Sequence, residues 1–276
     1  MTKTLLTLVA TSIITLSCTA QAQKINTDND KPVTKEHFAG KNFDGLKIGS
    51  KFDVEITKGD KRSIEITVPE FAVEHITVEI NEGVAQIYCD NVINNAQNGF
   101  WSMIKRNNWE FNVKITTPDI NNLRVSGQAS VTFLSKFDAK NLTIVCSGQS
   151  SVENLKFDVS ESVNLHTSGQ SDIEDAKTTG AHNTTITCSG QSDIELSSQN
   201  TRSVTLATSG QSDISFDALT VENGKIHSSG QSDIDFNVTT GGEITASSSG
   251  SSSININGQL KGLSQKNSGS SSIQVN

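Results

Sequence analysis

The sequence predicts an all-β protein, a single-domain parallel β-solenoid (a β-helix) with about 20 residues per coil. A short segment beginning Ser-Gly recurs at an almost constant period, and apolar residues alternate with polar ones inside each period. The composition agrees, because hydrophobic residues make up only 34% of the 276 residues and aromatic residues 5%. A narrow solenoid interior needs few large side chains, whereas a large globular core needs many.

The first 22 residues are expected to direct export. Lys3 precedes an apolar run from Leu5 to Leu16 that is too short to cross a bilayer, and Ala20-Gln21-Ala22 fits a cleavage site. Residues 1–22 would then be a signal peptide, while acylation of Cys18 stays open as the alternative. Both place the protein in the periplasm, at the outer membrane or outside the cell, and we expect no transmembrane segment after cleavage.

Residues 23–32 are polar and predict a flexible N-terminal segment, and residues 33–119 predict a less regular β region that starts or caps the solenoid. Phe52–Ile56 and Ser63–Val68 alternate across a polar turn, so we expect a hairpin or adjacent coil strands. Ile76–Ile80 and Val84–Tyr88 flank Asn81-Glu82-Gly83, which predicts a second hairpin.

Residues 120–276 carry the repeat and predict eight solenoid coils of three short strands each. The repeated unit reads Ser-Gly, three polar or small residues, and then Val or Ile. Its glycines are 21, 21, 21, 20, 20, 20 and 19 residues apart: Gly127, Gly148, Gly169, Gly190, Gly210, Gly230, Gly250 and Gly269. Such regularity is the signature of stacked repeats.

The alternation within the unit predicts which side chains point inward. Counting from the glycine, position +4 is always Val or Ile, position −4 is mostly Leu or Ile, and position +6 is often apolar. Positions −2 and +2 are small. Even offsets are therefore expected inside and odd offsets outside. The last coil has Gln265 and Asn267 at −4 and −2, which predicts a polar cap.

Charge and cysteine content exclude two classes of protein. The net charge is −8 with a pI near 5.1, and nucleic-acid binding needs a basic surface. Cys146 and Cys188 share offset −2 two coils apart, about 9.6 Å by stacking, which is too far for a disulfide. A disulfide framework is therefore not expected, although the state of Cys89 stays open.

The pattern around Phe43–Ile48 and Phe52–Asp60, followed by the Ser-Gly-Gln-Ser-Asp-Ile repeats, resembles the family of the putative auto-transporter adhesin, head GIN domain. The resemblance covers most of residues 40–276. It implies a β-solenoid similar to the pectate-lyase type, a location in the envelope or at the surface of Bacteroidetes-type bacteria, and no established enzymatic activity. It transfers no binding residues. The chain departs from a self-contained autotransporter, because we see no C-terminal membrane-barrel segment.

One outward column offers a candidate metal site. Four aspartates share offset +3 on consecutive coils, where their mutual repulsion could be relieved by a divalent cation such as Ca²⁺: Asp172, Asp193, Asp213 and Asp233. The alternative is a solvated acidic stripe that keeps the sheet soluble. Because the calcium-solenoid pattern Gly-Gly-x-Gly-x-Asp is absent, we expect weak or no calcium binding and no cofactor.

Two other groups of residues are candidate binding sites. Glutamines share offset +1, where stacked amides can hydrogen-bond along the axis or grip a polymer such as a glycan: Gln128, Gln149, Gln170, Gln191, Gln211 and Gln231. Residues 99–111 concentrate aromatic and basic side chains, including Trp101, Lys105, Arg106 and Trp109. That segment either covers the solenoid core or anchors a partner or membrane surface.

Catalysis has little support in the sequence. His166 and His227 share offset −3 near many serines, but Ser, His and Asp fall close together by chance in repeats of this composition. We therefore expect a non-catalytic binding or structural module of the envelope or surface, adhesin-like, whose partner is an envelope protein or a glycan. The alternatives are a polysaccharide lyase or hydrolase, and an envelope scaffold that self-assembles through a solenoid end into a homo-oligomer.

Overall fold

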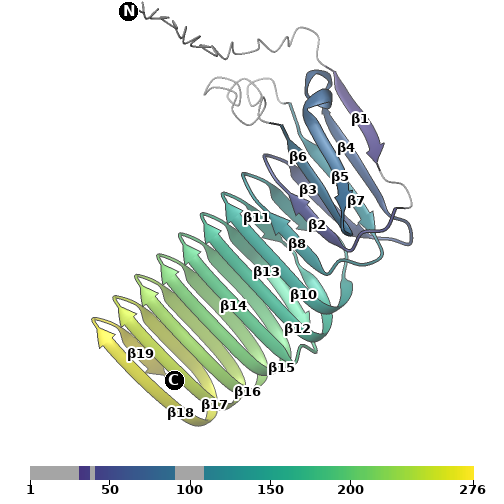
Figure 1. Ribbon diagram of the computed structural model, residues 1–276. Coiled ribbons are helices and arrows are strands. Elements are labelled where there is room, and N and C mark those ends of the chain that lie inside the picture. The colour runs from purple at the N-terminus through teal and green to yellow at the C-terminus, as the bar shows by residue number, and fades with distance from the viewer. Residues whose placement is uncertain (1–30, 38–40, 91–108) are drawn as a thin grey trace, which may run out of the picture.

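The computed structural model is a parallel β-solenoid whose coils stack in a row, with a smaller set of strands at the N-terminal end (Figure 1). It describes residues 31–37, 41–90 and 109–276. The predicted fold class is therefore confirmed. In that part of the chain no helix is suited to crossing a membrane, and the helical element η1 (Glu70–His75) is a short 3-10 segment.

The repeat region forms twelve strands that run through the coils in chain order: β8 (Asn122–Val125), β9 (Ser130–Phe133), β10 (Phe137–Gly148), β11 (Ser151–Glu153), β12 (Lys156–Gly169), β13 (Asp172–Thr179), β14 (Asn183–Gly190), β15 (Asp193–Gly210), β16 (Asp213–Gly230), β17 (Asp233–Gly250), β18 (Ser253–Gly269) and β19 (Ser272–Val275). The early coils have two strands each, such as β11 and β12, in place of the three short strands expected from the sequence. From β15 onward the bends remain, but the strand is continuous through them.

The coils stack in the register that the repeat predicts. Each repeat glycine from Gly148 onward lies beside the glycine of the next coil, through to Gly269. Backbone bonds tie these corners together, because each residue after the glycine donates its N–H to the glycine carbonyl of the preceding coil, as Gln191 does to Gly169 at 2.7 Å. We call this stretch, from the Ser before the glycine to the Gln after it, the glycine corner.

The glycine is required by both conformation and space. Gly190 has φ +92°, and a Cβ placed there would lie 2.6 Å from the carbonyl oxygen of Gly169. An L side chain rarely adopts this backbone conformation and could not fit between coils about 4.8 Å apart. The corner therefore turns sharply without a side chain at its apex.

The even offsets form the core, as predicted. The columns at −4 and +4 are buried from Leu123 and Val131 to Ala246 and Ile254. At +6, Phe216 and Phe236 stack with centroids 5.7 Å apart and planes 7° apart. Val275 is the exception at this offset, being 47% exposed, because no coil packs over it in the described structure. Gln265 and Asn267 of the last coil are exposed, as expected for a polar cap.

The change of period has a structural cause. Ile173 pairs with Ile194, but Ala176 pairs with Leu196, so one residue is lost between these coils and the period drops from 21 to 20. The same happens after Asn237, where the period drops to 19. Asp175, at the first of these sites, has φ 48°. The coils thus absorb length changes at bends and keep the inward columns in register.

Cys146 and Cys188 are buried and not bonded to each other, so the predicted absence of a disulfide between them is confirmed. They lie on alternate coils, separated by Thr167. Burial raises the pKa of the Cys146 thiol to about 12, and the Asp172 carboxylate adds to the rise. Cys89 is also buried, which raises the pKa of its thiol to about 12.

The N-terminal strands extend the coil stack out of chain order. They are β1 (Pro32–His37), β2 (Gly45–Ile48), β3 (Asp53–Lys58), β4 (Ser63–Pro69), β5 (Ile76–Asn81), β6 (Val84–Cys89) and β7 (Asn112–Thr117). β2 and β3 pair in parallel with β8 and β9 on one side, and with β6 and β7 on the other. The coil formed by β2 and β3 therefore lies between two coils that come later in the sequence, one with β6 and β7 and the other with β8 and β9.

One predicted hairpin is wrong and the other is confirmed. β3 and β4 are neither a hairpin nor adjacent coil strands, because β7 lies between them, parallel to β3 and antiparallel to β4. β5 and β6 do form an antiparallel hairpin, with Asn81 opposite Val84. Glu82 and Gly83 both have positive φ there, as a tight two-residue turn requires.

Candidate binding surfaces

The glutamines of the glycine corner form one continuous ladder. In each pair of neighbouring coils the Nε2 of one amide donates to the Oε1 of the next, at 2.7 Å from Gln128 to Gln149 and 3.0 Å from Gln211 to Gln231. The predicted bonding along the axis is confirmed. Each internal amide uses one donor and one acceptor in the ladder, which leaves one N–H and one lone pair facing solvent.

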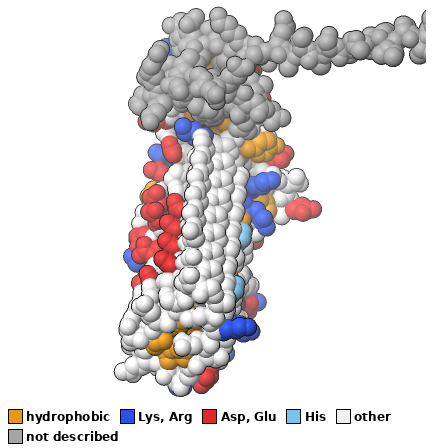
Figure 2. Space-filling view, turned by 90° about the vertical axis from the view of Figure 1, so that its left-hand side faces the viewer, with side chains coloured by type: hydrophobic (Ala, Val, Ile, Leu, Met, Phe, Trp, Pro, Cys, Tyr) orange, Lys and Arg blue, Asp and Glu red, His pale blue; other side chains and the backbone are white. Residues whose placement is uncertain are grey.

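Figure 2 looks onto this corner. A band of uncharged side chains and backbone runs along the solenoid, and acidic side chains gather along one side of it. The aspartate column (Asp172, Asp193, Asp213 and Asp233) belongs to the strands that begin just after the corner.

The aspartates bond to the backbone of the following coil. The Oδ1 of Asp172 accepts the N–H of Asp193 at 3.1 Å, and the pattern continues to Asp233, whose Oδ1 accepts the N–H of Ser253 at 3.1 Å. Burial raises the pKa of the Asp213 carboxyl; the bond from the Asp233 N–H opposes this, and the carboxylates of Asp193 and Asp233 add to it. The column therefore has a structural role that needs no cation.

In the described residues no three His, Cys, Asp or Glu side chains converge as a metal site would require. Oxygen ligands for Ca²⁺ usually surround the ion, whereas the four aspartates follow one another on successive coils. Weak or absent calcium binding stays a prediction.

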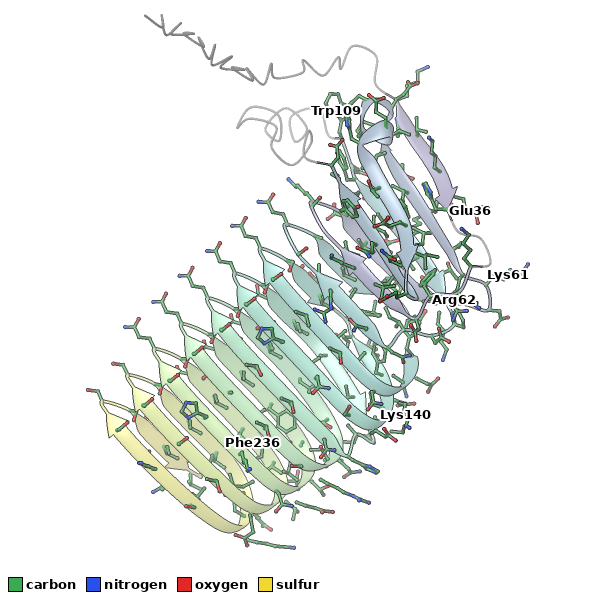
Figure 3. The ribbon with its side chains drawn as sticks, viewed as in Figure 1. Glu36, Lys61, Arg62, Trp109, Lys140 and Phe236 are labelled. Atoms are coloured by element: carbon green, nitrogen blue, oxygen red, sulfur yellow. The ribbon has the colours of Figure 1, made fainter. Side chains whose placement is uncertain are left out.

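The aromatic and basic candidates are only partly described. Trp101, Lys105 and Arg106 lie outside the described residues. Trp109 is half-buried and packs on Phe71 with ring centroids 5.1 Å apart, at the N-terminal end of the molecule (Figure 3). Phe111 is buried against Phe52. Trp109 thus contributes to covering the core at this end.

The histidines at offset −3 do not assemble a triad in the described structure. His227 Nδ1 lies 2.8 Å from the Oγ of Ser247 on the next coil, and no carboxylate is bonded to this imidazole. A nucleophile paired with a base also needs a third group to orient the base.

The structure shows a surface that the repeat did not indicate. Opposite the glycine corner each coil bends again, through residues 138–140, 158–160, 179–182, 200–202 and 220–222 in successive coils. We call this the far corner. Lys140 marks its position in Figure 3, on the side away from the arrowheads that end at the glycines. Two shallow cavities of about 690 and 210 Å³ lie along it.

The comparisons with known proteins agree with this architecture. The model of the family described as "Putative auto-transporter adhesin, head GIN domain" matches residues 42–259. The chain belongs to this family. Family membership points to an extracellular or surface location, and it agrees with a non-catalytic role. No curated protein matches the sequence.

Solved structures of similar fold include three from Parabacteroides species. A putative adhesin from Parabacteroides distasonis has a TM-score of 0.71 at 17% identity, with 91% of this chain and 98% of that chain covered. A putative adhesin from Parabacteroides merdae gives 0.69 at 17% identity, with 89% and 96% covered. A structure from P. distasonis described as a putative lipid binding protein gives 0.68 at 19% identity, with 89% and 96% covered. At these identities the similarity shows only that this GIN-domain chain has the same fold as the three solved structures.

Proposed function

We propose that this GIN-domain protein is a non-catalytic binding module of the cell envelope or surface, with an adhesin-like role toward a glycan or an envelope protein. Its location would be the periplasm, the outer membrane or the cell exterior. The family assignment and the adhesin names of the similar structures support this proposal.

The observation that carries the proposal is the periodic outer surface. Parallel stacking repeats each outward side chain about every 4.8 Å, as the glutamine ladder shows over six coils. A rigid array of identical groups suits a ligand that is itself repetitive, because several weak contacts then act together and raise the avidity.

A binding screen with a turnover assay tests the proposal. Residues 23–276 would be incubated with glycans, including anionic polysaccharides, and with envelope proteins, and bound ligand would be measured beside new reducing or unsaturated chain ends. We expect saturable binding and an unchanged ligand. New chain ends that grow with time would instead support the lyase or hydrolase alternative, and no binding to any ligand would overturn the proposal.

A scaffold that self-assembles is the second candidate. The last coil leaves Leu260, Leu263 and Ile273 only partly buried, and Val275 is exposed. Figure 2 shows apolar side chains at this end of the solenoid. A second copy of the chain could cover them and pair with the uncovered strand edge. Light scattering would then give twice the monomer mass, and a monomer mass over the whole concentration range would exclude it.

A further inference from the structure

The two cavities of the far corner form one groove. The larger is lined by three consecutive coils, from Asp138 to His182, and the smaller by three coils from Gly180 to Glu222. They share Gly180 and His182, so the depression continues over five coils. With coils about 4.8 Å apart, the groove extends about 19 Å along the solenoid, enough for several sugar residues or a short extended chain.

The floor of the groove is smooth and mostly apolar. Val159 and Ala181 are 2% and 1% exposed, and they lie with Gly180 along the bottom. Gly180 has φ +77°, and a Cβ there would lie 3.0 Å from the carbonyl oxygen of Val159. The glycine therefore keeps the floor low where the two cavities meet.

Uncharged hydrogen-bonding groups line the central part of the groove. Thr179, Asn200 and Thr220 lie on successive coils. The Thr179 hydroxyl donates to Asp158 Oδ1, and Thr220 Oγ1 donates to Asn200 Oδ1 at 2.7 Å, so each threonine hydroxyl can still accept a bond from a ligand. The Asn200 amide still has both N–H donors available. Such groups match the hydroxyls of a sugar.

A cationic side chain, Arg202, lies beside these groups next to the imidazole of His182. The carbonyl of His182 accepts the N–H of Arg202 at 3.0 Å, which places the two residues on neighbouring coils of the groove. Within the described residues the Arg202 guanidinium forms no ion pair, not even with Glu222 on the following coil. A guanidinium offers a planar pair of donors to a carboxylate or sulfate.

The acidic residues near the larger cavity are already neutralised. Asp158 pairs with Lys136 at 2.7 Å, Asp138 with Lys58 at 2.6 Å, and Glu161 with Lys140 at 3.0 Å. In the smaller cavity Arg202 is a cation without an ion pair among the described residues, and Glu222 is the one acidic residue of its lining. Because its other carboxylates are paired, the groove repels an anionic group less than the acidic stripe beside the glycine corner does, and an anionic ligand would compete with Glu222 for Arg202.

We propose that the far-corner groove binds a segment of an anionic glycan. Arg202, with His182 beside it, holds a carboxylate or sulfate, Thr179, Asn200 and Thr220 bond to hydroxyls, and the floor at Val159 and Ala181 contacts the apolar faces of the sugar rings. This assigns a site and a ligand class to the proposed binding function, and so rests on it.

Calorimetric titration of residues 23–276 with three oligosaccharides of about six sugars tests the groove: an oligogalacturonate, a heparin fragment and neutral maltohexaose. Arg202→Gln removes the charge and keeps a polar side chain that can still donate a hydrogen bond. Lys225→Gln is the matched control, because Lys225 is an exposed cation on an outward-facing strand position away from the groove. We expect Arg202→Gln to weaken binding of the anionic ligand about tenfold or more, since a charge-assisted pair is lost. Lys225→Gln should change it less than twofold.

The possible outcomes distinguish a failure of the groove proposal from a failure of the proposed binding function. Binding of the oligogalacturonate alone, or of the heparin fragment alone, identifies carboxylate or sulfate as the group that Arg202 holds. Equal losses in both variants would overturn the groove in favour of unspecific attraction. So would a loss caused by Gln191→Leu with Gln211→Leu but not by Arg202→Gln. If neither anionic ligand binds while another glycan or an envelope protein does, the groove proposal fails and the binding function stands.

Discussion

At the scale of single residues, Asp213 shows how the acidic column responds to pH. Its pKa lies above the usual value of 3.8, chiefly because of burial. Well below pH 3.8 the carboxyl is protonated in both the folded and the unfolded chain and carries no penalty. As the pH rises through the raised folded-state pKa, the folded protein must accept an unfavourable charge, so this group's contribution to stability falls.

Asp213→Asn should therefore stabilise the protein at neutral pH. The Asn Oδ1 can still accept the N–H of Asp233, while the charge is gone. The gain in unfolding free energy should grow from about pH 3.8 toward neutrality, as measured by urea titrations at several pH values. Asp60→Asn is the control for net charge, since Asp60 is exposed in the turn after β3. A gain equal in both variants would contradict the prediction.

Two buried hydroxyls without hydrogen-bond partners give a second test at the scale of single residues. The Oγ1 of Thr178 and the Oγ of Ser198 lie on neighbouring coils and have no hydrogen-bond partner in the described structure. Replacing such a group with an apolar one removes a desolvation cost, so Thr178→Val should raise the unfolding free energy by about 1 kcal/mol.

Ser192→Ala is the matched comparison for Thr178→Val. Its hydroxyl is also buried, but donates to the carbonyl of Ser189 at 2.8 Å. This variant should lose about 1 kcal/mol. Chemical denaturation of both proteins measures the difference, and a loss of stability in Thr178→Val would contradict the reasoning.

At the scale of elements, the glycine corner depends on close backbone approach. Gly83 in the β5–β6 turn has φ +78° and open space near its Cβ position, with the nearest atom, the Asp44 Oδ1, at 3.6 Å. Gly83→Ala should therefore lose only the conformational cost, about 1–2 kcal/mol. Gly190→Ala adds the 2.6 Å approach to Gly169 and should lower the Tm clearly more. Equal Tm values by circular dichroism would mean that the corner tolerates a side chain.

The repeat allowed the coils to be predicted because each is specified locally. Position +4 identifies the inward column from Val131 to Ile254 without knowledge of any partner strand. The N-terminal order could not be predicted in this way. β3 and β4 alternate as hairpin strands do, but their pairing with β7 is decided by contacts between segments more than 40 residues apart in sequence.

The far-corner groove was missed for a related reason. Comparing residues at equal offsets from the repeat glycines detects only residue types that recur from coil to coil, such as the glutamines and aspartates. Arg202 and His182 share offset −8 from their glycines, but other coils have Lys140, Glu161 and Glu222 at that place, so no single residue type recurs there. The sequence shows that Arg202 is the last arginine of the chain. The sequence does not show that Arg202 lines the same cavity as Gly180, because this follows only from the stacking of the coils.

At the scale of the whole molecule, cohesion comes from neighbouring coils. The strand pairings from β15 to β18 join each coil only to the one before and the one after it. In such one-dimensional stacks, local stability depends on how many neighbours a coil has. An internal coil is bonded on both sides, while the last coil, residues 259–276, is bonded to one neighbour.

Hydrogen exchange should expose this difference. Amides of a parallel strand point alternately to either side, so about half of those in residues 259–276 have no partner strand in the described structure. Peptides from this coil should exchange about tenfold or more faster than peptides from residues 203–230, as measured by mass spectrometry at low protein concentration. Equal protection at every concentration would contradict the nearest-neighbour account. Protection of the last coil that rises with concentration would instead show a second copy covering this edge, because only association slows exchange in proportion to the amount of protein present.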